Sequence, residues 1–155
     1  MTTIAWDGAH MVADTLSTDA WGMREHCDDK IMLGKDFIVG GAGQYGVIKR
    51  WWKQVSSMTF DMVKNYGVPE FDPDKFDPTL LLVGIEPDGT VGVYRTTQGI
   101  FYRTPYRYFA IGSGRDYAMA AMYFCKTAIE AVTCAADLDN GTGKPLIVRS
   151  FDDCR

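Results

Sequence analysis

The sequence lacks the features that mark several large classes of protein. No run of apolar residues approaches the roughly 20 that a membrane-spanning helix requires, so we expect no membrane partner. An excess of basic residues is also absent, because 16 Lys and Arg stand against 20 Asp and Glu, a formal net charge of −4 at pH 7. Nucleic-acid affinity comes largely from clustered Lys and Arg that release counterions, and this balance therefore argues against DNA or RNA as a partner.

Cysteine and histidine are few, and their spacing excludes further classes. The four cysteines lie far apart and form no Cys-x-x-Cys pair, which predicts neither a zinc site nor a disulfide framework. We expect reduced thiols in a cytoplasmic protein, since the first residues also lack the basic and apolar regions of a secretion signal. His10 and His26 are the only histidines, and no Ser or Cys stands in a nucleophile-elbow context, so no hydrolase triad is indicated. No dinucleotide or P-loop motif is complete, and we predict no cofactor and no metal.

What is present predicts one globular domain over residues 1–155. Hydrophobic residues make up 46% of the sequence and aromatic residues 13%, which is enough to build a core. A chain of this length buries roughly 68–70% of the surface that it exposes when unfolded, so it needs no disulfide or metal to stabilise it. Internal repeats, low-complexity segments and a domain linker are absent from the sequence.

Short apolar runs separated by turn residues predict a series of β-hairpins. The first has strands at 3–6 and 10–13 around Asp7-Gly8, a dipeptide suited to a tight turn. The second joins 30–33 to 37–40, and the third joins 80–85 to 90–94. Further short strands are expected near 100–102, 108–111 and 145–148, whereas the polar stretch 15–29 is expected to be irregular.

Helical spacing of apolar residues predicts three helices. The first covers residues 44–66, and the three prolines of residues 67–78 end it in a loop or a short broken helix. The second follows Ser113 and runs to about Cys125, and the third runs to about Leu138 from a capping box in which Thr127 precedes Glu130 by three residues. Antiparallel hairpins with helices gathered in blocks indicate an α+β fold, and we expect the helices to cover the outer faces of the sheets.

Thr2 carries the most informative chemistry in the sequence. Removal of Met1 would expose both a hydroxyl and a free α-amine on this residue. An α-amine has a pKa of about 7.7–8.0, so near neutral pH it can accept the hydroxyl proton and act as the general base. The alternative is that threonine follows the start methionine by chance.

Several short motifs occur in an order that resembles a known family. They are Thr2-Thr3-Ile4, Met11-Val12-Ala13-Asp14, Lys30, Gly40-Gly41-Ala42-Gly43, Ile111-Gly112-Ser113-Gly114 and Asp139-Asn140-Gly141-Thr142-Gly143. In this order and spacing they resemble proteasome β-type subunits, and more closely HslV, the bacterial proteasome-like peptidase, and small phage relatives. The resemblance covers the chain from Thr2 to about Val148.

The resemblance implies an N-terminal nucleophile hydrolase with a four-layer αββα sandwich and threonine-type endopeptidase activity. Thr2 would be the nucleophile, with its own amine as base. Lys30 would lower the pKa of the Thr2 hydroxyl and stabilise developing negative charge, and Asp14 would pair with Lys30. The backbone amide of Gly43 would supply the oxyanion donor.

The same resemblance implies a second group of polar residues at the site. Ser113 and Asp139 would orient the Thr2 amine by hydrogen bonding, and Thr142 would support their turn. Taken singly, these residues have structural explanations: Ser113 can be the N-cap of the helix that follows it, as Gly43 can be a glycine at a helix start.

Asp14 and Lys30 have structural explanations too. Asp14 can cap the polar segment after its strand, and Lys30 can be a solvated charge at a strand end.

Partners and rival functions also follow from the resemblance. It implies a protein or peptide substrate, a homo-oligomeric ring and an ATP-dependent unfoldase as partner. Some loops are shorter than in the bacterial peptidase, so the surfaces that form the ring could differ from those of that protein. Two other functions stay in consideration: a catalytically silent assembly protein with the same fold, and an amidohydrolase that acts on a small amide.

Overall fold

The computed structural model describes residues 2–18, 21–27, 29–69, 72 and 78–154. Its strands are β1 (Thr3–Trp6), β2 (Met11–Asp14), β3 (Leu16–Thr18), β4 (Arg24–His26), β5 (Ile31–Leu33), β6 (Phe37–Ala42), β7 (Thr79–Ile85), β8 (Val91–Thr97), β9 (Ile100–Arg103), β10 (Phe109–Gly112) and β11 (Leu146–Arg149). Its helices are α1 (Tyr45–Val55), α2 (Phe60–Tyr66), α3 (Arg115–Tyr123), α4 (Ala128–Leu138) and a short 3-10 turn at Phe151–Asp153. The described chain is therefore a mixed α/β structure with four α-helices, in agreement with the expected combination of antiparallel sheets and helices.

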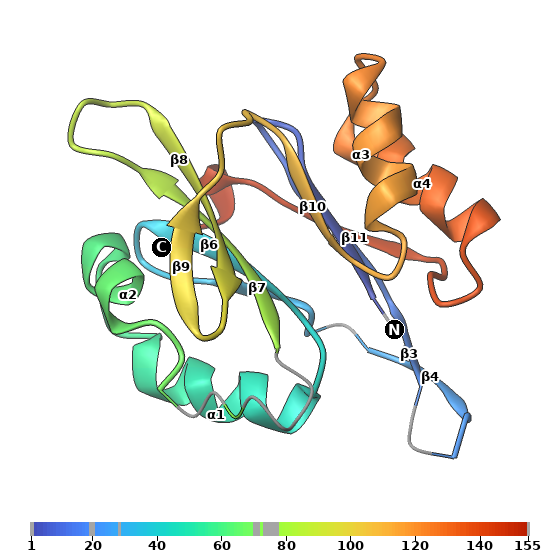
Figure 1. Ribbon diagram of the computed structural model, residues 1–155, viewed down its shortest axis with the longest axis horizontal. Coiled ribbons are helices and arrows are strands. Elements are labelled where there is room, and N and C mark those ends of the chain that lie inside the picture. The colour runs from blue at the N-terminus through green and yellow to red at the C-terminus, as the bar shows by residue number, and fades with distance from the viewer. Residues whose placement is uncertain (1, 19–20, 28, 70–71, 73–77, 155) are drawn as a thin grey trace.

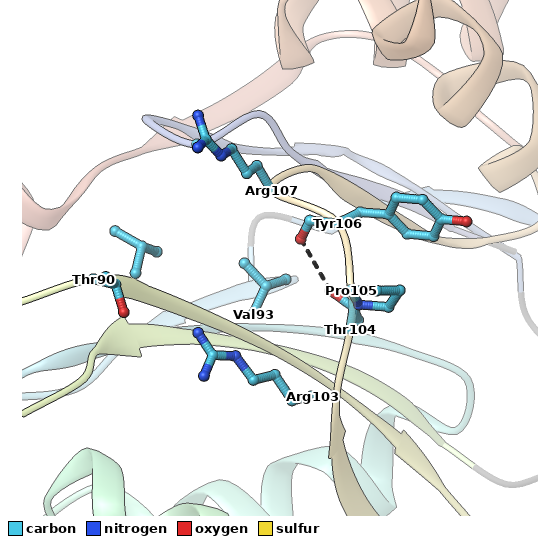
Figure 2. Close-up of a pocket in the computed structure, with 9 residues that line it drawn as sticks. Thr90, Val93, Arg103, Thr104, Pro105, Tyr106 and Arg107 are labelled. Carbon is cyan, nitrogen blue, oxygen red and sulfur yellow. Dashed lines mark hydrogen bonds between the residues drawn. The ribbon is translucent and has the colours of Figure 1, made fainter. Parts of the chain in front are cut away.

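The strands form two main sheets and a separate ribbon. One sheet has the order β10-β1-β2-β11, the other has the order β5-β6-β7-β8-β9, and β3 pairs with β4 alone. Neighbouring strands are antiparallel throughout. Because β9 belongs to one sheet and β10 to the other, the segment between them carries the chain across from sheet to sheet (Figure 2).

The three predicted hairpins are confirmed by the strand pairing. In the first, the Asp7 carboxylate accepts hydrogen bonds from the backbone amides of Ala9 and His10 at 2.9 and 2.8 Å. Gly8 has a φ of +102°, a backbone conformation that residues other than glycine rarely adopt. The turn therefore brings β2 back beside β1 and leaves Thr2 and Asp14 at the same end of the pair.

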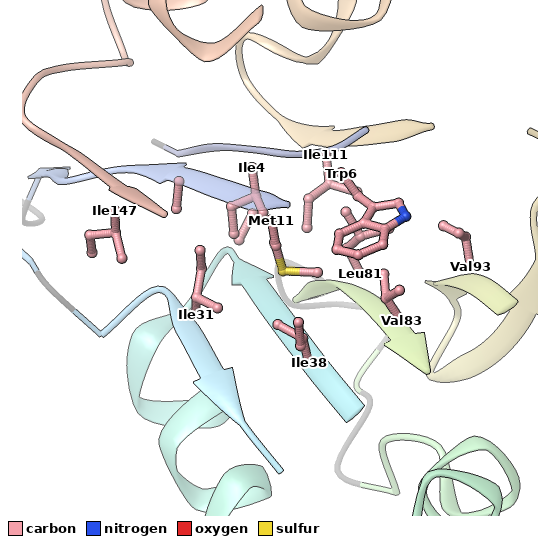
Figure 3. Packing of buried hydrophobic residues seen from close by; sticks show 12 residues of the cluster. Ile4, Trp6, Met11, Ile31, Ile38, Leu81, Val83, Val93, Ile111 and Ile147 are labelled. Carbon is pink, nitrogen blue, oxygen red and sulfur yellow. The ribbon is translucent and has the colours of Figure 1, made fainter. Parts of the chain in front are cut away.

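Period-two alternation in the strands divides the core into three apolar clusters. In β1, Ile4 and Trp6 face the second sheet (Figure 3), whereas Ala5 faces α3 and α4. In β7, Leu81 faces the first sheet and Leu82 faces α1 and α2. These strands are buried on both faces, which explains why they read as continuous apolar runs rather than as alternating ones.

The same clusters show how the helices and sheets are stacked. The two sheets face each other across the cluster that contains Trp6, α1 and α2 cover the five-stranded sheet, and α3 and α4 cover the four-stranded sheet (Figure 1). The expectation that helices cover the outer sheet faces is confirmed. In the described part of the chain, no helix has the length and apolar character needed to cross a bilayer.

The single helix predicted over residues 44–66 is wrong, because the structure has two helices there. α1 ends at Val55, and α2 begins after Thr59, whose side chain caps it by accepting a hydrogen bond from the Met62 amide. The amide of Phe60 also donates to the Asp36 carboxylate at 2.8 Å. Both helices pack their apolar residues into the same cluster against the five-stranded sheet, so the apolar spacing in the sequence continues across the break.

The polar stretch predicted to be irregular contains the β3–β4 ribbon. Leu16 pairs with His26, and Thr18 pairs with Arg24. All of β4 is exposed and β3 is only half-buried, so no apolar pattern marks these strands in the sequence. Of the predicted loop at 67–78, residues 70–71 and 73–77 lie outside the described residues.

A glycine in β7 tests the packing of the second sheet against its helices. A Cβ at Gly84 would lie 2.4 Å from ring carbons of Phe60 in α2, which itself is buried. We expect Gly84→Ala to lower the free energy of unfolding by about 1–3 kcal/mol, because the ring has to move out of a packed core. Urea unfolding measures the loss.

The control for this variant is Gly46→Ala at an exposed position of α1. A Cβ at Gly46 would meet the Arg50 side chain at 3.7 Å, an ordinary contact, and alanine favours the helix. Stability should stay level or rise in this control. Equal losses of stability in the two variants would contradict the packing described.

Candidate active site

Thr2 is held in place at the end of the four-stranded sheet, directly before β1. Its carbonyl accepts a hydrogen bond from the Ser113 amide at 2.8 Å, and only 9% of the residue is exposed. Gly112, with a φ of +96°, is opposite Thr3 in the strand pairing, and a Cβ there would lie 1.7 Å from the Thr2 carbonyl oxygen. Glycine at position 112 is therefore required for the close approach that fixes Thr2.

Asp14 and Lys30 form a buried ion pair beside this strand end. The Lys30 Nζ lies 2.9 Å from Asp14 Oδ1, and the two side chains are 5% and 0% exposed. Lys30 also donates to the backbone carbonyl of Leu16. The explanation of Lys30 as a solvated strand-end charge is wrong, because a buried ammonium of this kind is stable only when it is paired and hydrogen-bonded.

The Asp14 carboxylate gathers donors from three separate segments of the chain. Oδ1 accepts from the Thr3 amide at 2.9 Å in addition to Lys30, and Oδ2 accepts from the amides of Leu16 and Gly143 at 3.2 and 3.1 Å. Asp14 therefore does cap the turn after β2, as the structural explanation has it, and pairs with Lys30 as well. Through the Thr3 amide, the carboxylate is bonded to the residue next to Thr2.

Ser113, Asp139 and Thr142 form a second cluster on the other side of the strand end. Asp139 Oδ2 accepts from the Ser113 hydroxyl at 2.7 Å and from the Thr142 hydroxyl at 2.6 Å. Burial raises the pKa of Asp139, but hydrogen bonds from Thr142, Ser113 and the Gly141 backbone act against it, and the net effect holds the pKa below its usual value. The side chain is therefore an anion at neutral pH.

Thr3 connects this cluster to β1, and the sequence analysis assigned it no role. Its hydroxyl accepts from the Gly114 amide at 3.0 Å and lies 2.5 Å from the Thr142 hydroxyl. Because Thr142 donates its one proton to Asp139, the Thr3 hydroxyl is the donor to Thr142. The only signal in the sequence was a polar residue at the buried start of an apolar strand.

Gly43 lies at the end of β6, close to Lys30 along the second sheet. The Gly41 amide donates to the Lys30 carbonyl at 3.0 Å, so the glycine turn leaves the sheet next to Lys30. Gly43 has a φ of +121° and precedes the N-cap residue Gln44, which places it outside α1. The role of the Gly43 amide as oxyanion donor stays a prediction.

The structural explanation of Ser113 as the N-cap of α3 is wrong. Gly114 holds that position, with no side-chain hydrogen bond to the helix end. The Ser113 hydroxyl is directed instead to Asp139.

A groove of about 550 Å³ includes Asp29, the residue before Lys30 in the chain, in its lining. It is lined by Ser17, Thr18, Glu25, His26, Cys27, Asp29 and Tyr45. Asp29 accepts from Lys49 at 2.7 Å and from the Tyr45 hydroxyl at 2.8 Å, and these contacts lower its pKa. The groove is therefore lined mainly by polar side chains. In the described ranges, no three His, Cys, Asp or Glu side chains converge to hold a metal ion.

Comparison with known proteins supports the fold. No family model matches the sequence, and no curated protein matches it. Among solved structures, the chain is similar to that of Thiobacillus denitrificans BPH in complex with epoxomicin, at 18% sequence identity and a TM-score of 0.67. The likeness covers 97% of this chain and 98% of the other, so the two proteins share an overall fold.

The burial of the Lys30–Asp14 ion pair can be tested by its effect on stability. Lys30→Met removes the cation and leaves the Asp14 carboxylate buried without its charged partner, which should lower the free energy of unfolding by about 3–5 kcal/mol. Lys49→Met is the control, because it breaks the exposed pair with Asp29 and should leave stability near that of the wild type. Urea unfolding measures the stability of both variants. Equal losses of stability in Lys30→Met and Lys49→Met would contradict the burial of the Lys30–Asp14 pair.

The hydrogen bond from Ser113 to Asp139 can be tested through the pKa of Asp139. Ser113→Ala removes one donor and should raise the pKa of Asp139 toward its usual value, as carboxyl NMR titration would show. Because the pKa is lower in the folded than in the unfolded state, Asp139 stabilises the fold above the unfolded pKa and loses this effect as pH falls through the folded pKa. In Ser113→Ala, the free energy of unfolding should therefore fall less steeply as the pH is lowered.

Asp88, whose pKa is lowered by hydrogen bonds from Thr90, is the internal control and should titrate unchanged in Ser113→Ala. An unaltered pKa of Asp139 in the variant would contradict the assigned hydrogen bond.

Proposed function

We propose that the chain is a threonine-type endopeptidase of the proteasome and HslV-like class, with Thr2 as the N-terminal nucleophile after removal of Met1. Met1 itself lies outside the described residues. The observation that carries the proposal is the buried Lys30–Asp14 pair, bonded through Asp14 to the amide of Thr3. Because Asp14 accepts from the amide of the residue that follows Thr2, we infer that the Lys30 charge lies close to the proposed nucleophile.

The proposed reaction uses the two functional groups of Thr2. The free α-amine takes the hydroxyl proton as the oxygen attacks a peptide carbonyl, and Lys30 stabilises the negative charge that develops. The oxyanion of the tetrahedral intermediate accepts a hydrogen bond from the Gly43 amide, a contact typically worth about 2.7–4 kcal/mol. Collapse breaks the C–N bond, and the ammonium returns its proton to the leaving amine.

Water then completes the cycle by hydrolysing the ester on Thr2. The same amine removes a proton from the water, which attacks the ester carbonyl, and the hydroxyl of Thr2 is regenerated as the peptide acid leaves. The anion of Asp139 and the hydroxyl of Ser113 serve to orient the amine, which needs acceptors for its protons. Thr142 holds Asp139 in position at 2.6 Å.

The fold gives a second line of support. Two facing sheets, each covered by a helix pair, agree with the four-layer αββα sandwich of N-terminal nucleophile hydrolases. The similar Thiobacillus protein was solved with epoxomicin, a proteasome-type inhibitor. On this proposal a peptide side chain occupies the groove lined by Asp29 and Tyr45. The subunits form a homo-oligomeric ring in the cytoplasm, and an ATP-dependent unfoldase supplies substrate.

Peptide hydrolysis by Thr2 variants tests the proposal. Thr2→Ala should lower kcat/KM for fluorogenic peptides by at least about a thousandfold, since the nucleophile is lost. Thr2→Ser is the matched control and should keep measurable activity because it retains a hydroxyl and an α-amine. Wild-type activity should fall as pH drops below about 7.7–8.0, where the free amine becomes protonated.

The two alternative functions give different results in the same assay. Activity toward small amides without activity toward peptides would identify an amidohydrolase that uses the same nucleophile. A chain that keeps Met1 and hydrolyses neither substrate would be the silent assembly protein. Full peptidase activity in Thr2→Ala would overturn the proposed nucleophile.

A further inference from the structure

A second cavity, of about 700 Å³, lies far from the candidate active site. Its walls include Gly8 in the first hairpin turn, Val93 in β8, and residues 103–107 between β9 and β10 (Figure 2). Thr2 precedes β1 and Gly8 follows it, so at about 3.3 Å per residue the two sites are roughly 20 Å apart. The volume is within the range of small-molecule pockets.

The charged residues that line this cavity are Arg103 and Arg107. They approach from opposite walls, one at the end of β9 and the other from the segment that enters β10, and both side chains extend along the cavity (Figure 2). The whole chain carries a net charge of −4. The two charged side chains in the cavity lining are therefore both cationic, in a protein that is acidic as a whole.

Arg103 lies close enough to Glu86 and Asp88 to interact with both electrostatically, but neither arginine of the cavity is held in a direct polar contact by the described residues. Within the residues that the structure describes, Arg103 and Arg107 form no side-chain hydrogen bond or ion pair. Glu86 pairs with Lys64 at 3.0 Å, and Asp88 accepts hydrogen bonds from Thr90 at 2.6 and 2.9 Å, so these acids have other partners. A guanidinium has five donors and no acceptor, and such a pair binds carboxylate or phosphate oxygens best.

The segment between the two arginines is held in one conformation. The Thr104 amide donates to the Val93 carbonyl at 2.8 Å, and the Thr104 hydroxyl donates to the Tyr106 carbonyl at 3.2 Å. Thr104 is buried. The arginines therefore extend from a preorganised backbone, which lowers the entropy that a ligand has to overcome.

A buried donor lies behind the cavity wall. Trp6 is fully buried, and its indole N–H has no hydrogen-bond partner among the described residues. The nitrogen side of the ring faces Val93, a residue of the cavity wall (Figure 3). The indole N–H is too deeply buried to reach a ligand in the cavity, so the polar contacts to a ligand would come from the lining residues themselves.

We propose that this cavity binds a small organic anion, in which a carboxylate or phosphate group lies between Arg103 and Arg107 and an apolar part packs against Val91, Val93 and Pro105. The site is separate from Thr2, so the proposal does not depend on the peptidase function. The binding energy comes from charge-assisted hydrogen bonds at one end of the ligand and apolar burial at the other.

Isothermal titration calorimetry of the full chain tests the proposal with three probes: phenyl phosphate, benzoate and the neutral benzyl alcohol. We expect saturable binding of at least one anion, and the tighter of the two identifies the favoured anionic group. Arg103→Gln and Arg107→Gln should each raise Kd by about tenfold or more, because each removes charged donors while keeping a polar side chain.

Arg24→Gln, in the exposed strand β4, is the matched control, since it removes the same charge at a distance and should leave Kd unchanged. The proposal is overturned if neither anion gives saturable heat up to about 10 mM, well above the Kd of a weak site. It is also overturned if benzyl alcohol binds as well as the anions, or if the control weakens binding equally. Loss of subunit assembly in the two cavity variants, without any binding heat, would assign the arginines to a contact between copies instead.

Discussion

The buried ion pair between Asp14 and Lys30 is the interaction on which the geometry around Thr2 depends. Its carboxylate accepts hydrogen bonds from the start of β1, from the turn after β2 and from Gly143 near the C-terminal strand. Its cation comes from the start of β5 in the other sheet. One pair of side chains therefore ties both sheets together at the end of the molecule where Thr2 lies.

Such a pair is costly to bury, and its value is better explained by function than by stability. A well-packed apolar pair at the same place is often as stable or more stable than a buried salt bridge. On the proposed function, the cation would supply a fixed positive charge near Thr2, which has a hydroxyl and, after removal of Met1, would have a free amine. The chain of hydrogen bonds from Gly114 through Thr3 and Thr142 to Asp139 fixes the other side.

Much of this arrangement could be predicted from the sequence because its signals are local. Turn residues such as Asp7-Gly8 define the hairpins, and Thr127 with Glu130 defines the start of α4. Long-range or unpatterned features could not be predicted. The break between α1 and α2 leaves the apolar spacing intact, the β3–β4 ribbon buries too little to leave a pattern, and the role of Thr3 depends on a residue 139 positions away. The roles of Gly43 and Thr2 in catalysis rest on resemblance and stay predictions.

Whether Thr2 becomes an N-terminal nucleophile can be measured by the intact mass of the purified chain, before and after incubation with epoxomicin. We expect a chain without Met1 that gains the mass of one inhibitor, and a Thr2→Ala variant that gains none. A chain that retains Met1 and stays unlabelled would contradict the proposed nucleophile.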